Sequence, residues 1–100
     1  MTATARHALV APVLPDGIDT PVVVVDLDIV ERNASRLADA LARRGIALRP
    51  HVKTHKSLGL ARLQLDAGAS GITVGNLGEA EVFAGGGFHD IFVAYPVWAE

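Results

Sequence analysis

Short apolar runs alternate with amphipathic stretches along most of this chain. Residues 21–26 hold four consecutive valines without polar alternation, which is typical of a strand covered on both faces. The apolar positions that follow change to helical spacing and form one stripe, made of Val30, Ala34, Leu37, Ala38 and Leu41. The pattern therefore predicts a strand over residues 21–26 and then a helix. Asp28 would begin this helix with Glu31 as its capping-box partner, and Gly45 would end it.

The same alternation of strand and helix continues to the end of the chain. Further strands are predicted over residues 46–53, 70–75 and 90–95. Ser57 would cap the helix between the first two, and Asn76 would cap the helix between the last two. The strand centres are about 20 residues apart, a spacing that predicts parallel strands joined by right-handed helical crossovers. The fold class is therefore α/β.

Composition narrows the kinds of protein that fit this pattern. Half of the 100 residues are apolar and the formal net charge is −2, which argues against a nucleic-acid surface. The chain has no cysteine, so a disulfide framework or a thiolate metal site is impossible, and a reducing compartment is favoured. Apolar runs such as residues 22–25 are far too short to span a bilayer. We expect a cytoplasmic protein with neither a nucleic-acid nor a membrane partner.

One segment departs from this apolar background. Residues 49–57 read Arg-Pro-His-Val-Lys-Thr-His-Lys-Ser, a dense group of basic side chains where a predicted strand ends and a helix begins. In barrel and open-sheet α/β folds, that junction is where chemistry is placed. Strand alternation would put His51 and Lys53 on one face and Val52 on the other. His51 is thus a candidate pocket residue, although a structural histidine fits the pattern equally well.

A metal site at this segment is less favoured. His51 and His55 have the spacing of the zinc helix motif His-Glu-x-x-His, but residue 52 is valine, so the general base of that motif is missing. In an extended segment the two rings would also lie roughly 13 Å apart. We therefore expect no shared ion at these residues.

Two motifs give the chain a family resemblance. Thr20 to Asp28 reads Thr-Pro-Val-Val-Val-Val-Asp-Leu-Asp, and residues 49–56 follow as Arg-Pro-His-Val-Lys-Thr-His-Lys. With Gly-Glu-Ala-Glu at 78–81 and Gly-Gly-Phe-His-Asp-Ile at 86–91, this resembles the D-threonine aldolase and D-serine dehydratase family. Its members are pyridoxal-phosphate (PLP) enzymes with an alanine-racemase-like barrel. The resemblance covers residues 20–95.

The resemblance implies roles for several residues. Lys53 would hold PLP as a Schiff base and, once freed by the substrate amine, could act as general base at Cα. His51 would orient this lysine or contact the cofactor. The phosphate cup and a divalent metal would depend on later segments, and the whole protein could be a homodimer. Lys56 and Ser57 more plausibly have solvated or helix-capping roles.

The resemblance also implies a domain plan. Residues 1–20 would be an N-terminal arm, and residues 21–45 a leading strand and helix, with the strand joining a separate β domain. Residues 46–100 would be the first units of an N-terminal, PLP-binding (β/α)8 barrel. The chain would be the N-terminal part of a larger protein, although a small complete α/β domain is an alternative.

The expected function is that of a PLP-dependent lyase for small D-amino acids. It would cleave a D-3-hydroxy amino acid by a retro-aldol reaction or deaminate D-serine. An amino-acid racemase, or a non-catalytic PLP-binding protein on the same barrel, is the alternative, and a basic-loop interaction module would need no PLP. Among the remaining polar residues, Gly75 and Asn76 could border the pocket or simply form a turn and cap. Glu79 and Glu81 diverge on a helix and do not form an acid–base pair.

Overall fold

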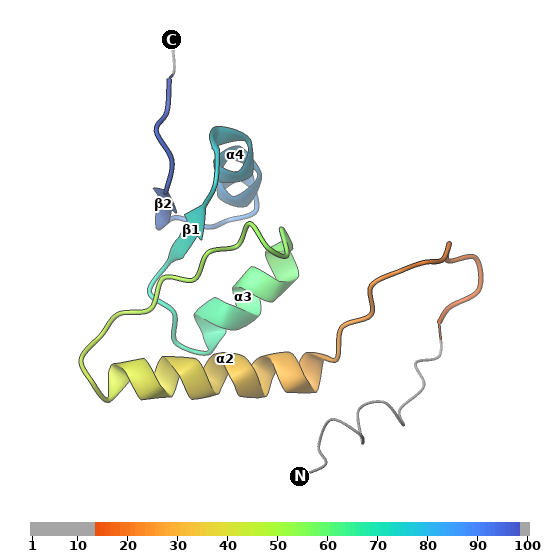
Figure 1. Ribbon diagram of the computed structural model, residues 1–100, viewed down its shortest axis with the longest axis horizontal. Helices are drawn as coiled ribbons and strands as arrows, with labels where there is room; N and C mark the ends of the chain where they lie inside the picture. Colours follow the sequence, from red (N-terminus) through yellow and green to blue (C-terminus); the bar gives the residue numbers. More distant parts are fainter. Residues whose placement is uncertain (1–13, 99–100) are drawn as a thin grey trace.

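The structure, a computed structural model, describes residues 14–98 (Figure 1), so most of the expected arm over residues 1–20 lies outside the described range. These residues form an α/β arrangement of three helices and two strands. In chain order the elements are α2 (Leu27–Ala42), α3 (Leu58–Asp66), β1 (Ile72–Val74), α4 (Leu77–Gly85) and β2 (Ile91–Val93). No helix within residues 14–98 is long and apolar enough to cross a membrane.

The strands are parallel, as the sequence predicts. Ile72 pairs with Ile91 and Val74 with Val93, and a further parallel bridge joins His51 to Thr73. Three chain segments therefore run side by side in the same direction, with β1 between the segment of His51 and β2. The carboxyl ends of all three lie at one edge.

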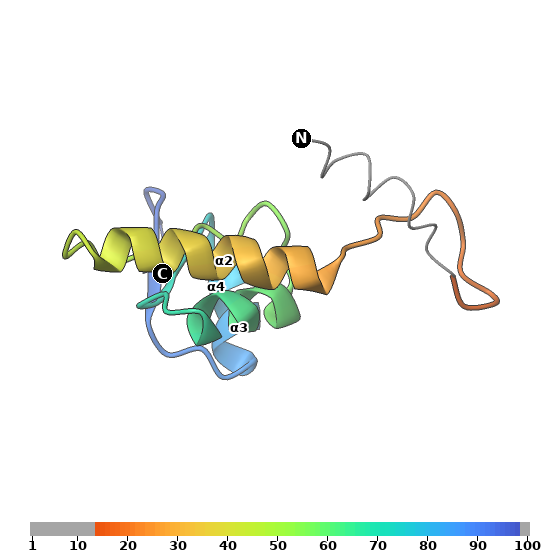
Figure 2. The same ribbon diagram turned by 90° about the horizontal axis from the view of Figure 1, so that it is seen from below.

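The core lies between the strands and two helices. Its buried members are Val52, Ala61 from α3, Ile72 and Val74 from β1, Phe83 from α4, and Phe88. The rings of Phe83 and Phe88 meet edge to face at 5.3 Å between centroids, an arrangement that favours aromatic pairs. Helix α2 lies along α3, as Figure 2 shows, and takes no part in this buried cluster. Helices α3 and α4 thus cover one face of the strands.

The strand predicted over residues 21–26 is wrong for the described structure. These residues form no strand and are exposed, with Val23 86% accessible. Figure 1 shows the segment before α2 running away from the other elements. A strand needs a neighbour to accept and donate its ladder hydrogen bonds, and this segment has none within residues 14–98.

The helix start predicted at Asp28 is also wrong by two residues. Asp26 is the N-cap, because its Oδ1 accepts the backbone N–H groups of Asp28 and Ile29 at 3.0 and 3.3 Å. Asp28 lies in the first turn, where a negative charge is favoured by the helix dipole. The other predicted caps are confirmed: Ser57 Oγ accepts from Leu60 N–H, and the side chain of Asn76 caps α4.

The strand predicted over residues 46–53 is present only as an isolated bridge at His51. The segment does run beside β1, since the carbonyls of Leu48 and Pro50 accept from Ser70 and Thr73 N–H. Pro50 has no N–H of its own, which interrupts the ladder at this point. A turn then begins at Val52, so Lys53 lies just beyond the strand-like segment and not within it.

Candidate active site

Lys53 lies in a tight turn at the carboxyl edge of the strands. Val52 anchors the turn, because its side chain is fully buried and its N–H donates to the Thr73 carbonyl. The turn closes when Lys56 N–H donates to the Val52 carbonyl at 2.8 Å. Lys53 itself is exposed, and no carboxylate within residues 14–98 forms an ion pair with its amine. The amine is thus available at the edge where parallel α/β folds place their sites.

His51 is directly coupled to this lysine. Its Nδ1 accepts the backbone N–H of Lys53 at 3.2 Å, so in this arrangement a neutral ring carries its proton on Nε2. His51, Thr73 and Phe92 are register partners across the three segments. Their side chains alternate with those of Val52, Ile72 and Val74, which enter the core beneath the helices. His51 therefore lies on the face that α3 and α4 leave free, half-buried beside the turn.

Gly75 lies beside Lys53, at a point where three side chains come close together. A Cβ atom at this glycine would stand 3.7 Å from His51 Cε1, 3.8 Å from Lys53 Cβ and 3.3 Å from Glu79 Oε1. The three side chains therefore surround one point directly beyond β1. The sequence left open whether Gly75 borders a pocket, and the structure places it between both predicted site residues.

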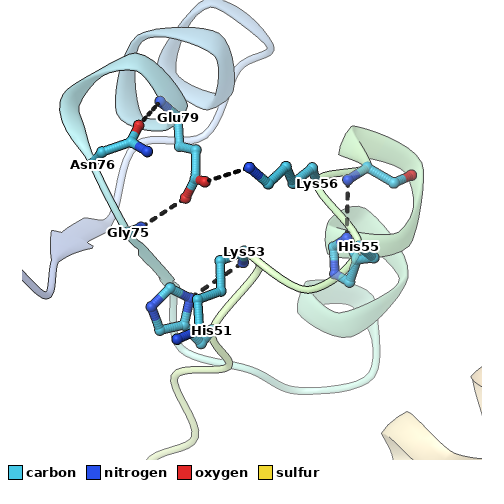
Figure 3. Close-up of polar contacts among 8 residues, drawn as sticks. His51, Lys53, His55, Lys56, Gly75, Asn76 and Glu79 are labelled. Carbon is cyan, nitrogen blue, oxygen red and sulfur yellow. Dashed lines mark hydrogen bonds and ion pairs between the residues drawn. The ribbon is translucent and has the colours of Figure 1, made fainter.

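Glu79 is a member of this cluster that the sequence analysis missed. Its Oε1 accepts the N–H of Gly75 at 2.7 Å, and its Oε2 pairs with the Lys56 amine at 3.2 Å, as Figure 3 shows. Its side chain is only 11% exposed. The hydrogen bond from Gly75, and then the Lys56 amine, hold the pKa of the Glu79 carboxyl below its usual range, against the opposing effect of burial. The carboxylate therefore stays ionised at neutral pH.

A capping signal could have located Glu79. Glu79 follows the N-cap Asn76 by three residues, the spacing of a capping box, and its N–H donates to Asn76 Oδ1 at 2.8 Å. In a capping box the glutamate returns to the N-cap backbone; here it reaches one residue further, to Gly75. That rule places a carboxylate at the loop before α4, although it says nothing of Lys56.

The sequence predicted a solvated or helix-capping role for Lys56, but the structure places its amine in an ion pair. Lys56 has a left-handed backbone with φ of 52°, and its side chain reaches across to Glu79. Ser57 has the expected capping role at α3. His55 lies away from Lys53: its Nδ1 accepts from Ser57 N–H, and its Nε2 meets Gln64 Oε1 at 3.1 Å.

Arg49 belongs to the opposite edge of the strands. Its guanidinium pairs with Asp90 at 2.8 Å and donates to the carbonyls of Ile72 and Asp90, which lie at the start of β1 and just before β2. The basic segment therefore divides, with Arg49 at the amino edge and Lys53 at the carboxyl edge.

The residues at the carboxyl edge fit a covalently held cofactor better than a metal. Among residues 14–98, no group of three or more His, Asp or Glu side chains could hold a metal ion. A PLP anchor instead needs a reachable amine, and the exposed Lys53 side chain supplies one.

Comparison with known proteins gives matches over most of this chain. It is 51% identical over 77 residues to the D-threo-3-hydroxyaspartate dehydratase of Delftia sp. (strain HT23), across 77% of this chain and 20% of that protein. It is 38% identical over 91 residues to the 3-hydroxy-D-aspartate aldolase of Paracoccus denitrificans, across 86% of this chain and 24% of that protein. The chain thus spans about a fifth of the length of these curated relatives. No family model matches it.

Solved structures agree with the sequence matches. The D-threo-3-hydroxyaspartate dehydratase from Delftia sp. HT23 matches with a TM-score of 0.77 and 48% identity, over 82% of this chain and 22% of that one. A variant of that dehydratase has also been solved in a metal-free form. The D-threonine aldolase from Filomicrobium marinum matches with a TM-score of 0.77 and 36% identity, over 81% of this chain and 22% of that one.

Proposed function

Because this chain belongs to the D-threonine aldolase and D-serine dehydratase family, we propose that it carries the cofactor anchor of a PLP-dependent lyase for D-amino acids. The observation that carries the proposal is the placement of Lys53. Its side chain is exposed in a turn at the carboxyl edge of parallel strands, beside His51 and Gly75. Residues 46–98 would then be the first units of a barrel, with this edge facing its pocket.

Each residue of the site has a physical task in this proposal. Lys53 would hold PLP, which when bound would supply an electron acceptor for the bond broken at the substrate Cα. The freed Lys53 amine can then move a proton at Cα, provided that it stays within hydrogen-bond reach. His51 fixes the backbone at Lys53 through Nδ1 and keeps an N–H at Nε2 as a donor on the same face.

The substrate class that we propose is the D-3-hydroxy amino acids. The dehydratase and the aldolase with the matches described above are both named for 3-hydroxy-D-aspartate chemistry. One reaction removes the Cα proton and the 3-hydroxyl group, and the other breaks the Cα–Cβ bond to release an aldehyde. A lysine at Cα serves either outcome, and racemisation would need the same group. The metal-free form of a relative supports a divalent metal in the whole protein, with ligands outside this chain.

The test is covalent labelling of the full-length protein with PLP. The protein is incubated with PLP, reduced with borohydride and digested, and the modified peptide is identified by mass spectrometry. We expect the label at Lys53, its loss in Lys53→Ala, and its retention in Lys56→Arg, which keeps the cation at the only other lysine of the chain. A label that persists in Lys53→Ala refutes the anchor. A label at Lys53 without turnover of D-threo-3-hydroxyaspartate, D-threonine or D-serine would instead favour an amino-acid racemase or a non-catalytic PLP-binding protein.

A further inference from the structure

The Glu79 carboxylate joins two loops that flank Lys53. One oxygen binds the N–H of Gly75 at the end of β1, and the other binds the amine of Lys56 at the end of the turn over residues 52–56 (Figure 3). The two contacts come from segments about 20 residues apart in the chain, consistent with one helical crossover between them. A single side chain on α4 therefore couples the position of the turn to the position of β1.

The turn itself depends on Lys56. Lys56 N–H donates to the Val52 carbonyl, and this hydrogen bond encloses Lys53, Thr54 and His55. Lys56 also has a positive φ of 52°, a conformation that costs a residue with a Cβ atom roughly 1–2 kcal/mol. The ion pair with Glu79 favours this conformation because it holds the Lys56 side chain on the side of β1. Glu79 thus acts on the residue that closes the turn.

The other end of the contact meets the site directly. The Cβ position of Gly75 lies within van der Waals reach of Glu79 Oε1, His51 Cε1 and Lys53 Cβ. Movement of the Gly75 backbone would therefore change the space beside Lys53. His51 adds a third restraint, since it accepts the Lys53 backbone N–H. His51 thus holds the turn at Lys53, and Glu79 holds the turn at its last residue, Lys56.

We propose that Glu79, through Lys56 and Gly75, is a positioning residue that sets where the Lys53 amine stands at the carboxyl edge. The proposal rests on the function proposed above and assigns Glu79 no contact with substrate or cofactor. Its role is to keep the turn in one conformation, which limits the range of positions that the Lys53 amine samples. Misplacement of a reacting group by about 1 Å can cost up to roughly 100-fold in rate.

Geometry separates this role from a general contribution to folding. The Lys56 side chain is 65% exposed, and ion pairs at such positions contribute little to stability. Loss of the pair should therefore slow the reaction of Lys53 while the melting temperature stays nearly unchanged. Glu81, on the same helix, is exposed and makes no hydrogen bond or ion pair within residues 14–98, so it provides a matched control.

The experiment uses the full-length protein and five variants: Glu79→Gln, Lys56→Met, the double variant of these two, Lys56→Arg and Glu81→Gln. Apoprotein is mixed with PLP, quenched with borohydride at timed intervals, and the modified Lys53 peptide is quantified. We expect Glu79→Gln and Lys56→Met each to slow labelling about tenfold, and the double variant to be no slower than either single variant. Glu81→Gln should match the unsubstituted protein, and Lys56→Arg should restore most of the rate. Melting temperatures are measured in parallel.

Three results of the labelling experiment would overturn the proposal. These are labelling of Glu79→Gln at the unsubstituted rate, losses that multiply in the double variant, and slowing that merely follows the unfolded fraction. Amide hydrogen exchange on the apoprotein gives a second reading that needs no PLP: the Lys56 amide should exchange faster in Glu79→Gln than in Glu81→Gln. If the unsubstituted protein takes no PLP at Lys53, the proposed function fails, and unchanged exchange at Lys56 would separately refute the role of Glu79.

Discussion

Gly71→Ala tests the arrangement at the amino edge of the strands, where Arg49 lies. Gly71 is buried, and an added Cβ would stand 2.6 Å from Arg49 Nη1, 2.8 Å from Asp90 Cγ and 2.8 Å from the Asp90 carbonyl oxygen. The two side chains are partly exposed and can move. The carbonyl cannot move freely, because it accepts the N–H of Ile72 at 3.0 Å and so joins the start of β1 to the segment before β2.

The expected cost follows from these contacts. Overpacking against a fixed backbone costs about 1–3 kcal/mol, and a weakened backbone hydrogen bond adds about 1 kcal/mol. The displaced pair of Arg49 and Asp90 is exposed enough to add at most about 1 kcal/mol. Alanine recovers about 0.4–1 kcal/mol by restricting the unfolded chain. We therefore expect Gly71→Ala to lower the free energy of unfolding by about 1–5 kcal/mol.

Gly85→Ala is the matched control. A Cβ at this last residue of α4 would meet nothing within 4 Å, so alanine should be neutral or stabilise by up to about 1 kcal/mol. Urea unfolding of the full-length protein, followed by far-UV circular dichroism, compares the two. Equal stability of Gly71→Ala and Gly85→Ala would refute the close approach of Asp90 to Gly71. Labelling of folded Gly71→Ala by PLP should stay normal, because Lys53 lies at the other edge.

Two further predictions concern the cap of α3 and the charge of Glu79. Ser57→Ala removes the acceptor of Leu60 N–H and should lower the free energy of unfolding by about 1 kcal/mol. Ser57→Asp keeps an acceptor at the cap and should retain most of the stability, and urea midpoints of the two variants test this difference. The pKa of Glu79 is lowered in the folded state, so its stabilising contribution, small for a pair this exposed, is complete above the unfolded value and is lost as pH falls through the lower folded pKa. Urea midpoints between pH 6 and 3 should fall less steeply for Glu79→Gln, and an unchanged slope would contradict this.

The elements predicted correctly are those specified by local chemistry. Ser57 and Asn76 each precede a helix and cap it through contacts three residues away. Strands β1 and β2 are short apolar runs separated by one helix, and right-handed crossover makes such strands parallel. Each of these inferences needs only a window of about 20 residues.

The features that the sequence analysis predicted wrongly or missed all depend on partners far away in the sequence. Four valines at residues 22–25 favour a strand by composition, yet a strand exists only where another segment completes its ladder, and residues 14–98 supply none there. Arg49 meets Asp90 from 41 residues away, and nothing near Arg49 in the sequence indicates that it points to the amino edge. Glu79 was set aside because helix geometry separates it from Glu81, although its partners lie off the helix.

The division of the basic segment explains why one of its lysines is suited to chemistry and the other is not. Lys53 and Lys56 are three residues apart, but the turn sends them to different surroundings. Lys56 faces a carboxylate that is ionised at neutral pH, and this ion pair holds its amine in place. Lys53 has no such partner within residues 14–98 and borders a glycine. An amine that must react needs freedom from a counter-ion and access to its partner, and of these two lysines only Lys53 has both within residues 14–98.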